Sequence, residues 1–223
     1  MAHGDGSGRL DAHDARQVRS LAAPGKFADD DGSPDLAIRQ ANDHRSLVHS
    51  LRRGRLLVPL VAVALDIEQS SRGATEKTSE MSVVSMVTRD GRRGLLGFTG
   101  VDSLQTWNPT ARPVPVAGVD AARAAIDADC EALVIDVLGP HTHVIPESDL
   151  VDLADVDRLE HARHVALSQF DRKFGPGRID VSSAGDRLRV KVIDSTIDAQ
   201  DLAASITARI ASLVPAGVEI LRN

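Results

Sequence analysis

Aromatic side chains are scarce in this 223-residue sequence: they make up 2% of it, with four Phe, one Trp and no Tyr. A folded core must therefore consist mainly of Val, Leu, Ile and Ala, which the 42% content of hydrophobic residues can supply. Recognition sites that depend on several clustered aromatic rings are disfavoured by the same scarcity.

Cysteine and long apolar runs are also in short supply. The single cysteine, Cys130, excludes an internal disulfide and a multi-cysteine metal site, and it favours a reducing compartment. The longest apolar run, Leu56–Leu65, has about ten residues, whereas a membrane helix needs roughly 20. Met1–Leu21 lacks the apolar stretch of a secretory signal. We therefore expect a cytoplasmic protein with no membrane partner.

The charge balance argues against nucleic acid as a partner. The formal net charge is −6 and the isoelectric point is near 5.7. Nonspecific affinity for nucleic acid comes mostly from clustered Lys and Arg that neutralise phosphates. The densest basic run, Arg52–Arg55, is better explained as the positively charged end of a helix.

Composition and periodicity divide the chain into three parts. Residues 1–34 are polar and charged with no apolar periodicity, which predicts a disordered tail. Residues 35–155 are expected to form an α+β domain that opens with one helix over Asp35–Arg53, a strand over Leu56–Ile67 and a flexible loop over Gln69–Glu80. Residues 156–223 change in character and form a smaller carboxy-terminal unit, which could be a separate domain or could extend the first sheet.

The clearest local signal is a hairpin that leads into a short helix. Met81–Thr88 and Gly94–Thr99 suit a pleated, half-buried surface, and Asp90-Gly91 between them supplies the left-handed backbone of a tight turn. A short helix over Gly100–Trp107 should follow. It should end before Asn108, because the residue before a proline, here Pro109, avoids helical angles.

The remaining pattern completes an α+β fold with a mixed or antiparallel sheet and packed helices, followed by an α-β-β-α-β unit. In order, the expected elements are an edge strand at Pro113–Val116, a helix at Asp120–Asp129, strands at Ala132–Leu138 and His141–Ile145, a helix at Pro146–Ala154, a helix at Asp157–Phe174, a hairpin of Ile179–Ser183 with Leu188–Ile193, a helix at Asp198–Val214 and a strand at Val218–Leu221.

No catalytic constellation can be read from the sequence. His141 and His143 share one strand face, a spacing that zinc or nickel sites use, but no third ligand is identifiable. Cys130 lacks a neighbouring base, and Thr99 and Ser103 have no general base near them in the sequence. We therefore predict no catalytic residues, no cofactor and no metal, with His141 and His143 as the alternative metal ligands.

Several motifs in a fixed order resemble the amino-terminal domain of the SseB family, in the form found in high-GC Gram-positive bacteria. The resemblance runs from about Phe27 to about Leu153 and rests on the Leu57-Val58-Pro59-Leu60 strand, the Asp90-Gly91-Arg92 turn, Leu96–Gly100, Leu104–Trp107 and Ala111–Val116. It implies a fold but brings no established catalytic residue or cofactor.

Three functional hypotheses follow. The first is a non-enzymatic cytosolic binding or regulatory protein that presents Phe98, Thr99 and Trp107 to a protein partner. The second is a metal-dependent enzyme or factor that uses His141 and His143. The third, suggested only by the family's name, is an accessory role in serine or sulfur metabolism. The sequence identifies neither the partner nor the oligomeric state.

Overall fold

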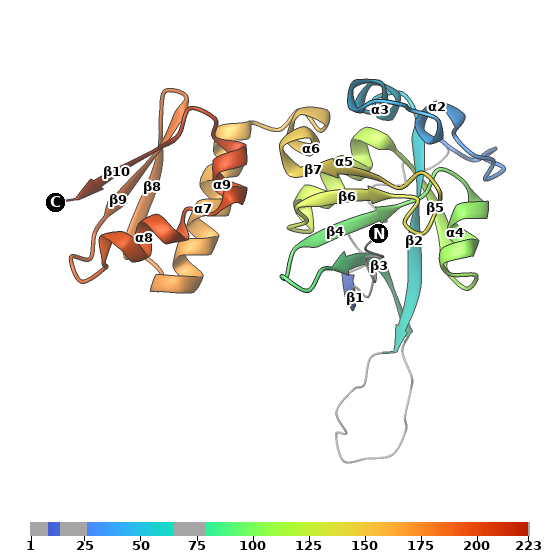
Figure 1. Cartoon of the computed structure of the whole chain (residues 1–223). Helices are drawn as coiled ribbons and strands as arrows, with labels where there is room; N and C mark the ends of the chain where they lie inside the picture. The colour runs from blue at the N-terminus through green and yellow to red at the C-terminus, as the bar shows by residue number, and fades with distance from the viewer. Residues whose placement is uncertain (1–8, 14–25, 65–78, 223) are drawn as a thin grey trace, which may run out of the picture. The chain divides into compact units, whose positions relative to one another are not determined.

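The computed structural model describes residues 9–13, 26–64 and 79–222, which divide into two compact units between Ala154 and Asp155 (Figure 1). Helices and strands mix in both units, and the larger sheet combines parallel with antiparallel pairs. The predicted α+β class is therefore confirmed. No helix in the described part of the chain has the length and apolar character needed to span a bilayer.

The first unit is built on one mixed sheet in the order β5-β2-β3-β4-β6-β7, with β1 added against β3. Its strands are β1 (Arg9–His13), β2 (Arg55–Ala64), β3 (Ser79–Val87), β4 (Arg93–Gly97), β5 (Arg112–Ala117), β6 (Ala132–Ile135) and β7 (His143–Pro146). The pairs are antiparallel except for β4 with β6, which run parallel. Carboxyl ends of two neighbouring strands therefore meet at one edge of this sheet.

Proline marks the border of the sheet, as the sequence predicts. β5 is an outer strand of the order above, and its Pro113 pairs with Pro59 of β2. Proline has no N–H to donate. This register therefore places the two residues that lack a backbone donor opposite each other, between β2 and the edge strand β5.

Helical structure before β2 differs from the prediction of one helix over Asp35–Arg53. There are two helices, α2 (Leu36–Arg39) and α3 (His44–Leu51). The second begins at a capping box, in which the Asp43 carboxylate accepts a hydrogen bond from the Ser46 backbone N–H at 2.8 Å. Local capping of this kind favours a new helix start over continuation.

The predicted hairpin is present as β3 and β4. Thr88 N–H donates to the Arg92 carbonyl at 2.9 Å, and Gly91 has a φ of +84°. That angle is strained for residues with a side chain, which explains glycine at this position. Of the expected loop over Gln69–Glu80, residues 69–78 lie outside the described residues and the last two begin β3.

Parts of the predicted disordered tail, residues 1–34, are ordered in the structure. Residues 9–13 form β1, and residues 26–34 form a loop held by Arg55. The Arg55 guanidinium donates to the Asp30 carboxylate and to the Ser33 and Thr99 carbonyls, and its side chain is only 11% exposed. The ion pair between Arg55 and Asp30 is a contact that apolar periodicity does not reveal. The other residues of this tail lie outside the described residues.

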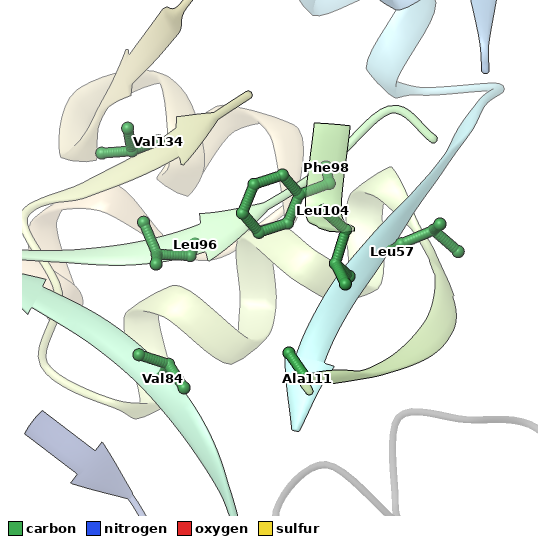
Figure 2. Close-up of a cluster of buried hydrophobic side chains, with 7 residues drawn as sticks. All are labelled: Leu57, Val84, Leu96, Phe98, Leu104, Ala111 and Val134. Carbon is green, nitrogen blue, oxygen red and sulfur yellow. The ribbon is translucent and has the colours of Figure 1, made fainter. Parts of the chain in front are cut away.

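The core beneath the hairpin is aliphatic around one aromatic ring. Figure 2 shows Phe98 beside Leu104 within a cluster that also contains Leu57, Val84, Leu96, Ala111 and Val134. Leu104 belongs to α4 (Val101–Trp107), whose Trp107 packs on the same cluster with its ring centroid 5.4 Å from that of Phe98. Two further helices, α5 (Gly118–Asp127) and α6 (Glu147–Leu153), complete the unit.

The second unit consists of α7 (Arg158–Phe174), β8 (Ile179–Ala184), β9 (Arg187–Val192), α8 (Ala199–Ser205), α9 (Ala208–Leu213) and β10 (Val218–Arg222). Its sheet has the order β10-β9-β8, with β8 antiparallel and β10 parallel to β9.

The single helix predicted over Asp198–Val214 is wrong, because α8 ends at Ser205 and α9 starts after Thr207. Gln169 of α7 donates to the Ser205 carbonyl, and Lys173 donates to the Ser205 hydroxyl at 2.7 Å. These side chains satisfy the end of α8, so the chain can turn there.

Candidate functional site

A pocket of about 260 Å³ lies beyond the carboxyl ends of the parallel strands β4 and β6 of the first unit. Its lining comes from three places in the sequence, namely α2, α4 and the loop after β6: Arg39, Asp102, Ser103, Thr106, Asp136, Leu138, Gly139, Pro140 and His141. In sheets that contain parallel strands, the crevice outside the carboxyl ends is a common ligand site.

Asp136, the first residue after β6, is the buried centre of the site. The residue is 4% exposed and accepts three hydrogen bonds: from Thr99 N–H at 2.9 Å, from Thr99 Oγ1 at 2.6 Å and from Ser103 Oγ at 2.6 Å. These hydrogen bonds offset the free-energy cost of removing a carboxylate from water. Asp136 thereby ties the end of β4 and the start of α4 to the end of β6.

Arg39 and Asp102 form a second charged pair on the pocket wall. Two guanidinium nitrogens of Arg39 each donate to one carboxylate oxygen of Asp102 at 2.7 Å, and Arg39 Nε donates to Thr99 Oγ1 at 2.7 Å. Arg39 Nε also lies 3.7 Å from Asp136 Oδ2. The hydrogen bonds from Arg39 lower the pKa of Asp102 to about 2, and Asp102 in turn raises the pKa of Arg39.

The loop after β6 forms the apolar side of the pocket in a strained conformation. Asp136 and Leu138 have φ angles of 52° and 77°, in the left-handed region that a side chain disfavours. Gly139 N–H and Thr142 Oγ1 both donate to the Asp136 carbonyl at 2.9 Å, which holds the turn. Leu138 lines the pocket and is 68% exposed, so the loop presents an apolar side chain to solvent.

The predicted binding residues Phe98, Thr99 and Trp107 do not form a surface together. Phe98 is 1% exposed and Thr99 is 0% exposed, so both are covered by the rest of the first unit, and the prediction that they contact a partner stays untested. Phe98 packs in the core, whereas Thr99 donates two hydrogen bonds to the Asp136 carboxylate. Trp107 is partly buried against the core cluster and keeps some exposed surface.

The predicted histidine pair is split by the structure. His141 is exposed and lines the pocket, while Nε2 of His143 is buried with no hydrogen-bond partner among the described residues. Among residues 9–13, 26–64 and 79–222, no three His, Cys, Asp or Glu side chains lie together as metal ligands. The alternative metal site at His141 and His143 thus gains no third ligand within that part of the chain.

Sequence reasoning missed Arg39, Asp102 and Asp136. Arg39 is 63 residues from Asp102, and Thr99 is 37 residues from Asp136, so no local motif joins them. One signal was available, because Asp136 directly follows a buried apolar strand and precedes a Gly-Pro turn.

Comparison with protein families matches most of the first unit. A family model described as the SseB protein N-terminal domain matches residues 36–151, which is just over half of the chain and includes every residue that lines the pocket. No curated protein and no solved structure matches the chain.

Proposed function

The chain belongs to the SseB family, and we propose that it works as a cytoplasmic, non-enzymatic binding or regulatory protein that receives part of a protein partner in the pocket beside Asp136. The observation that carries this proposal is that Arg39, Asp102, Ser103 and Asp136 on the pocket wall are joined to Thr99 or to one another by hydrogen bonds.

The carboxylates of Asp102 and Asp136 and the hydroxyl of Ser103 are already engaged in hydrogen bonds within the protein. Ser103 Oγ donates to Asp136 and lies 3.0 Å from the Gly100 carbonyl, and its described bonds include no imidazole that would take its proton. Asp102, with a pKa of about 2, stays ionised far below neutral pH. A general acid or base works best with a pKa near the operating pH. The network therefore favours a fixed binding wall over a reaction centre.

The size of the pocket favours a piece of a protein over a large cofactor. Pockets for drug-sized ligands range over about 300–1,000 Å³, and this cavity of about 260 Å³ falls below that range. It can take one side chain and its backbone. The exposed Leu138 beside it supplies apolar contact area of the kind that a partner would cover.

Affinity purification from native lysate, with matched variants, tests the proposal. Leu138→Asn removes the apolar side chain while keeping a residue that tolerates a positive φ. Val144→Thr is the control, since Val144 is 56% exposed on β7 and does not line the pocket. We expect a partner to co-purify with the parent and with Val144→Thr but to be lost with Leu138→Asn. Equal recovery with all three proteins would refute the pocket as the binding site.

The enzymatic alternative has a separate test. Metal analysis of the purified protein should find less than stoichiometric zinc or nickel. A full equivalent of metal that His141→Ala abolishes would favour the metal-dependent alternative instead.

A further inference from the structure

We infer that the group received by the pocket is a basic side chain, Arg or Lys, of the partner protein. This inference rests on the proposed binding function and specifies its chemistry. It follows from a count of the hydrogen-bond donors and acceptors that remain free on the pocket wall.

Apart from the exposed His141, whose ring can donate or accept, the side-chain donors of the pocket are largely used within the protein. Arg39 has five N–H groups, of which three donate to Thr99 and Asp102 and a fourth is directed at Ser103 Oγ at 3.4 Å. The Ser103 hydroxyl donates to Asp136, and the Thr106 hydroxyl donates to the Asp102 carbonyl at 2.8 Å. A hydroxyl has one proton to donate and two lone pairs to accept with. Ser103 and Thr106 therefore meet a ligand as acceptors.

The acceptors remain open to solvent. The Asp102 side chain is 57% exposed, and a carboxylate has about four acceptor positions, of which Arg39 occupies two. Thr106 is exposed one helical turn after Asp102. A wall that presents acceptors favours a ligand that is rich in donors, and ammonium and guanidinium groups carry three and five donors with no acceptor.

The net charge of the pocket wall is negative, which suits a positively charged ligand. One positive charge, on Arg39, faces two negative charges, on Asp102 and Asp136, so these groups leave an excess of one negative charge. An added anion would have to displace Asp102 from a bidentate pair with Arg39. A cation avoids that cost and can rest its methylene stem against Leu138 and Pro140.

An NMR titration of the full chain tests the inference with five small compounds. These are N-acetyl-arginine amide, N-acetyl-lysine amide, N-acetyl-citrulline amide, N-acetyl-glutamate amide and free L-arginine. We expect saturable shifts of the Ser103, Thr106 and His141 amide signals with the blocked arginine and lysine. The neutral citrulline compound should bind at least about tenfold more weakly, and the glutamate compound should not bind.

Two variants localise the effect. Asp102→Asn should weaken binding of the blocked arginine by about tenfold, and Thr106→Val should weaken it severalfold while keeping the shape of the wall. Asp90→Asn is the control, because Asp90 is an exposed carboxylate paired with Arg92 in the β3–β4 turn. It should bind like the parent.

Each contrary result has its own meaning. If the glutamate compound binds at the same signals as tightly as arginine, the pocket remains a binding site but the inference on charge is wrong. If free L-arginine binds much more tightly than the blocked compound, the ligand is a small amino acid and the protein-partner source is wrong. If no compound shifts these signals at saturating concentration, the inference fails, and the lysate purification decides the proposed function independently.

Discussion

At the scale of single residues, Asp136 connects the fold to the site. It lies at the end of one strand, accepts hydrogen bonds from the backbone and side chain of Thr99, and orients Ser103 on the pocket wall. Because Asp136 is 4% exposed and Thr99 is 0% exposed, water has no ready access to replace the bonds between them.

Replacing this carboxylate should therefore destabilise the protein strongly. Asp136→Ala leaves the Thr99 and Ser103 donors without their acceptor and removes the negative charge 3.7 Å from Arg39 Nε, and we expect a loss of about 3 kcal/mol in the free energy of unfolding. Urea denaturation measures this quantity. Asp186→Ala, at an aspartate whose side chain is 84% exposed, is the control and should leave stability nearly unchanged. Similar stability of both variants would show that the Asp136 bonds contribute nothing.

The ionisation of Asp102 gives a prediction on pH. Its pKa is about 2 in the folded protein, below the ordinary 3.8, so its pairing with Arg39 contributes stability above pH 3.8. That contribution is lost as the pH falls through the folded pKa. Arg39→Met should raise the Asp102 pKa toward 3.8, as followed by the carboxyl carbon shift in NMR. An unchanged pKa in that variant would assign the shift to another group.

The residues of the site were the part that sequence reasoning could not assemble. Arg39, Asp102 and Asp136 come from three elements, and their contacts depend on which strands become neighbours. Phe98 and Thr99 were singled out by motif, but burial decides their roles, and a motif does not show which face of a strand end points inward.

At the scale of elements, the sequence predicted well where the backbone itself requires a residue type. The Asp90-Gly91 turn and the prolines of the edge strand are found as expected, because positive φ and a missing N–H restrict where these residues fit. The helix breaks before Asp43 and after Ser205 were missed, because a capping box and contacts from α7 outweigh apolar periodicity there.

Trp107 provides a test at this scale, since it is the last residue of α4 and packs the helix against the core cluster. We expect Trp107→Ala to cost on the order of 3 kcal/mol through lost burial and the cavity left beside Phe98. Trp107→Phe should cost less, because an aromatic ring remains against the cluster. Thermal and urea unfolding compare the two. A Trp107→Ala protein that is as stable as the parent but fails to capture the partner would make Trp107 a recognition residue.

At the scale of the whole molecule, the chain combines two units that each have their own sheet. The family match ends at residue 151, three residues before the boundary between the units. The predicted division at 155/156 therefore remains a hypothesis about folding, which a fragment can test.

We expect residues 155–223 to fold alone. The unit has buried residues on α7, β8 and β9 that pack among themselves, which is the requirement for an independent core. The amide NMR spectrum of the isolated fragment should overlay on the corresponding signals of the full chain. A collapsed spectrum of narrow dispersion would show instead that this unit needs the first one to fold.

The most direct test of pocket binding is site-specific photocrosslinking in the native host. A photoreactive amino acid at position 138, on the pocket loop, should give a discrete covalent adduct with a protein partner, whereas the same amino acid at position 144, on the exposed face of β7, should not. Adducts at position 144 but not at position 138 would contradict the pocket as the site where this protein meets its partner.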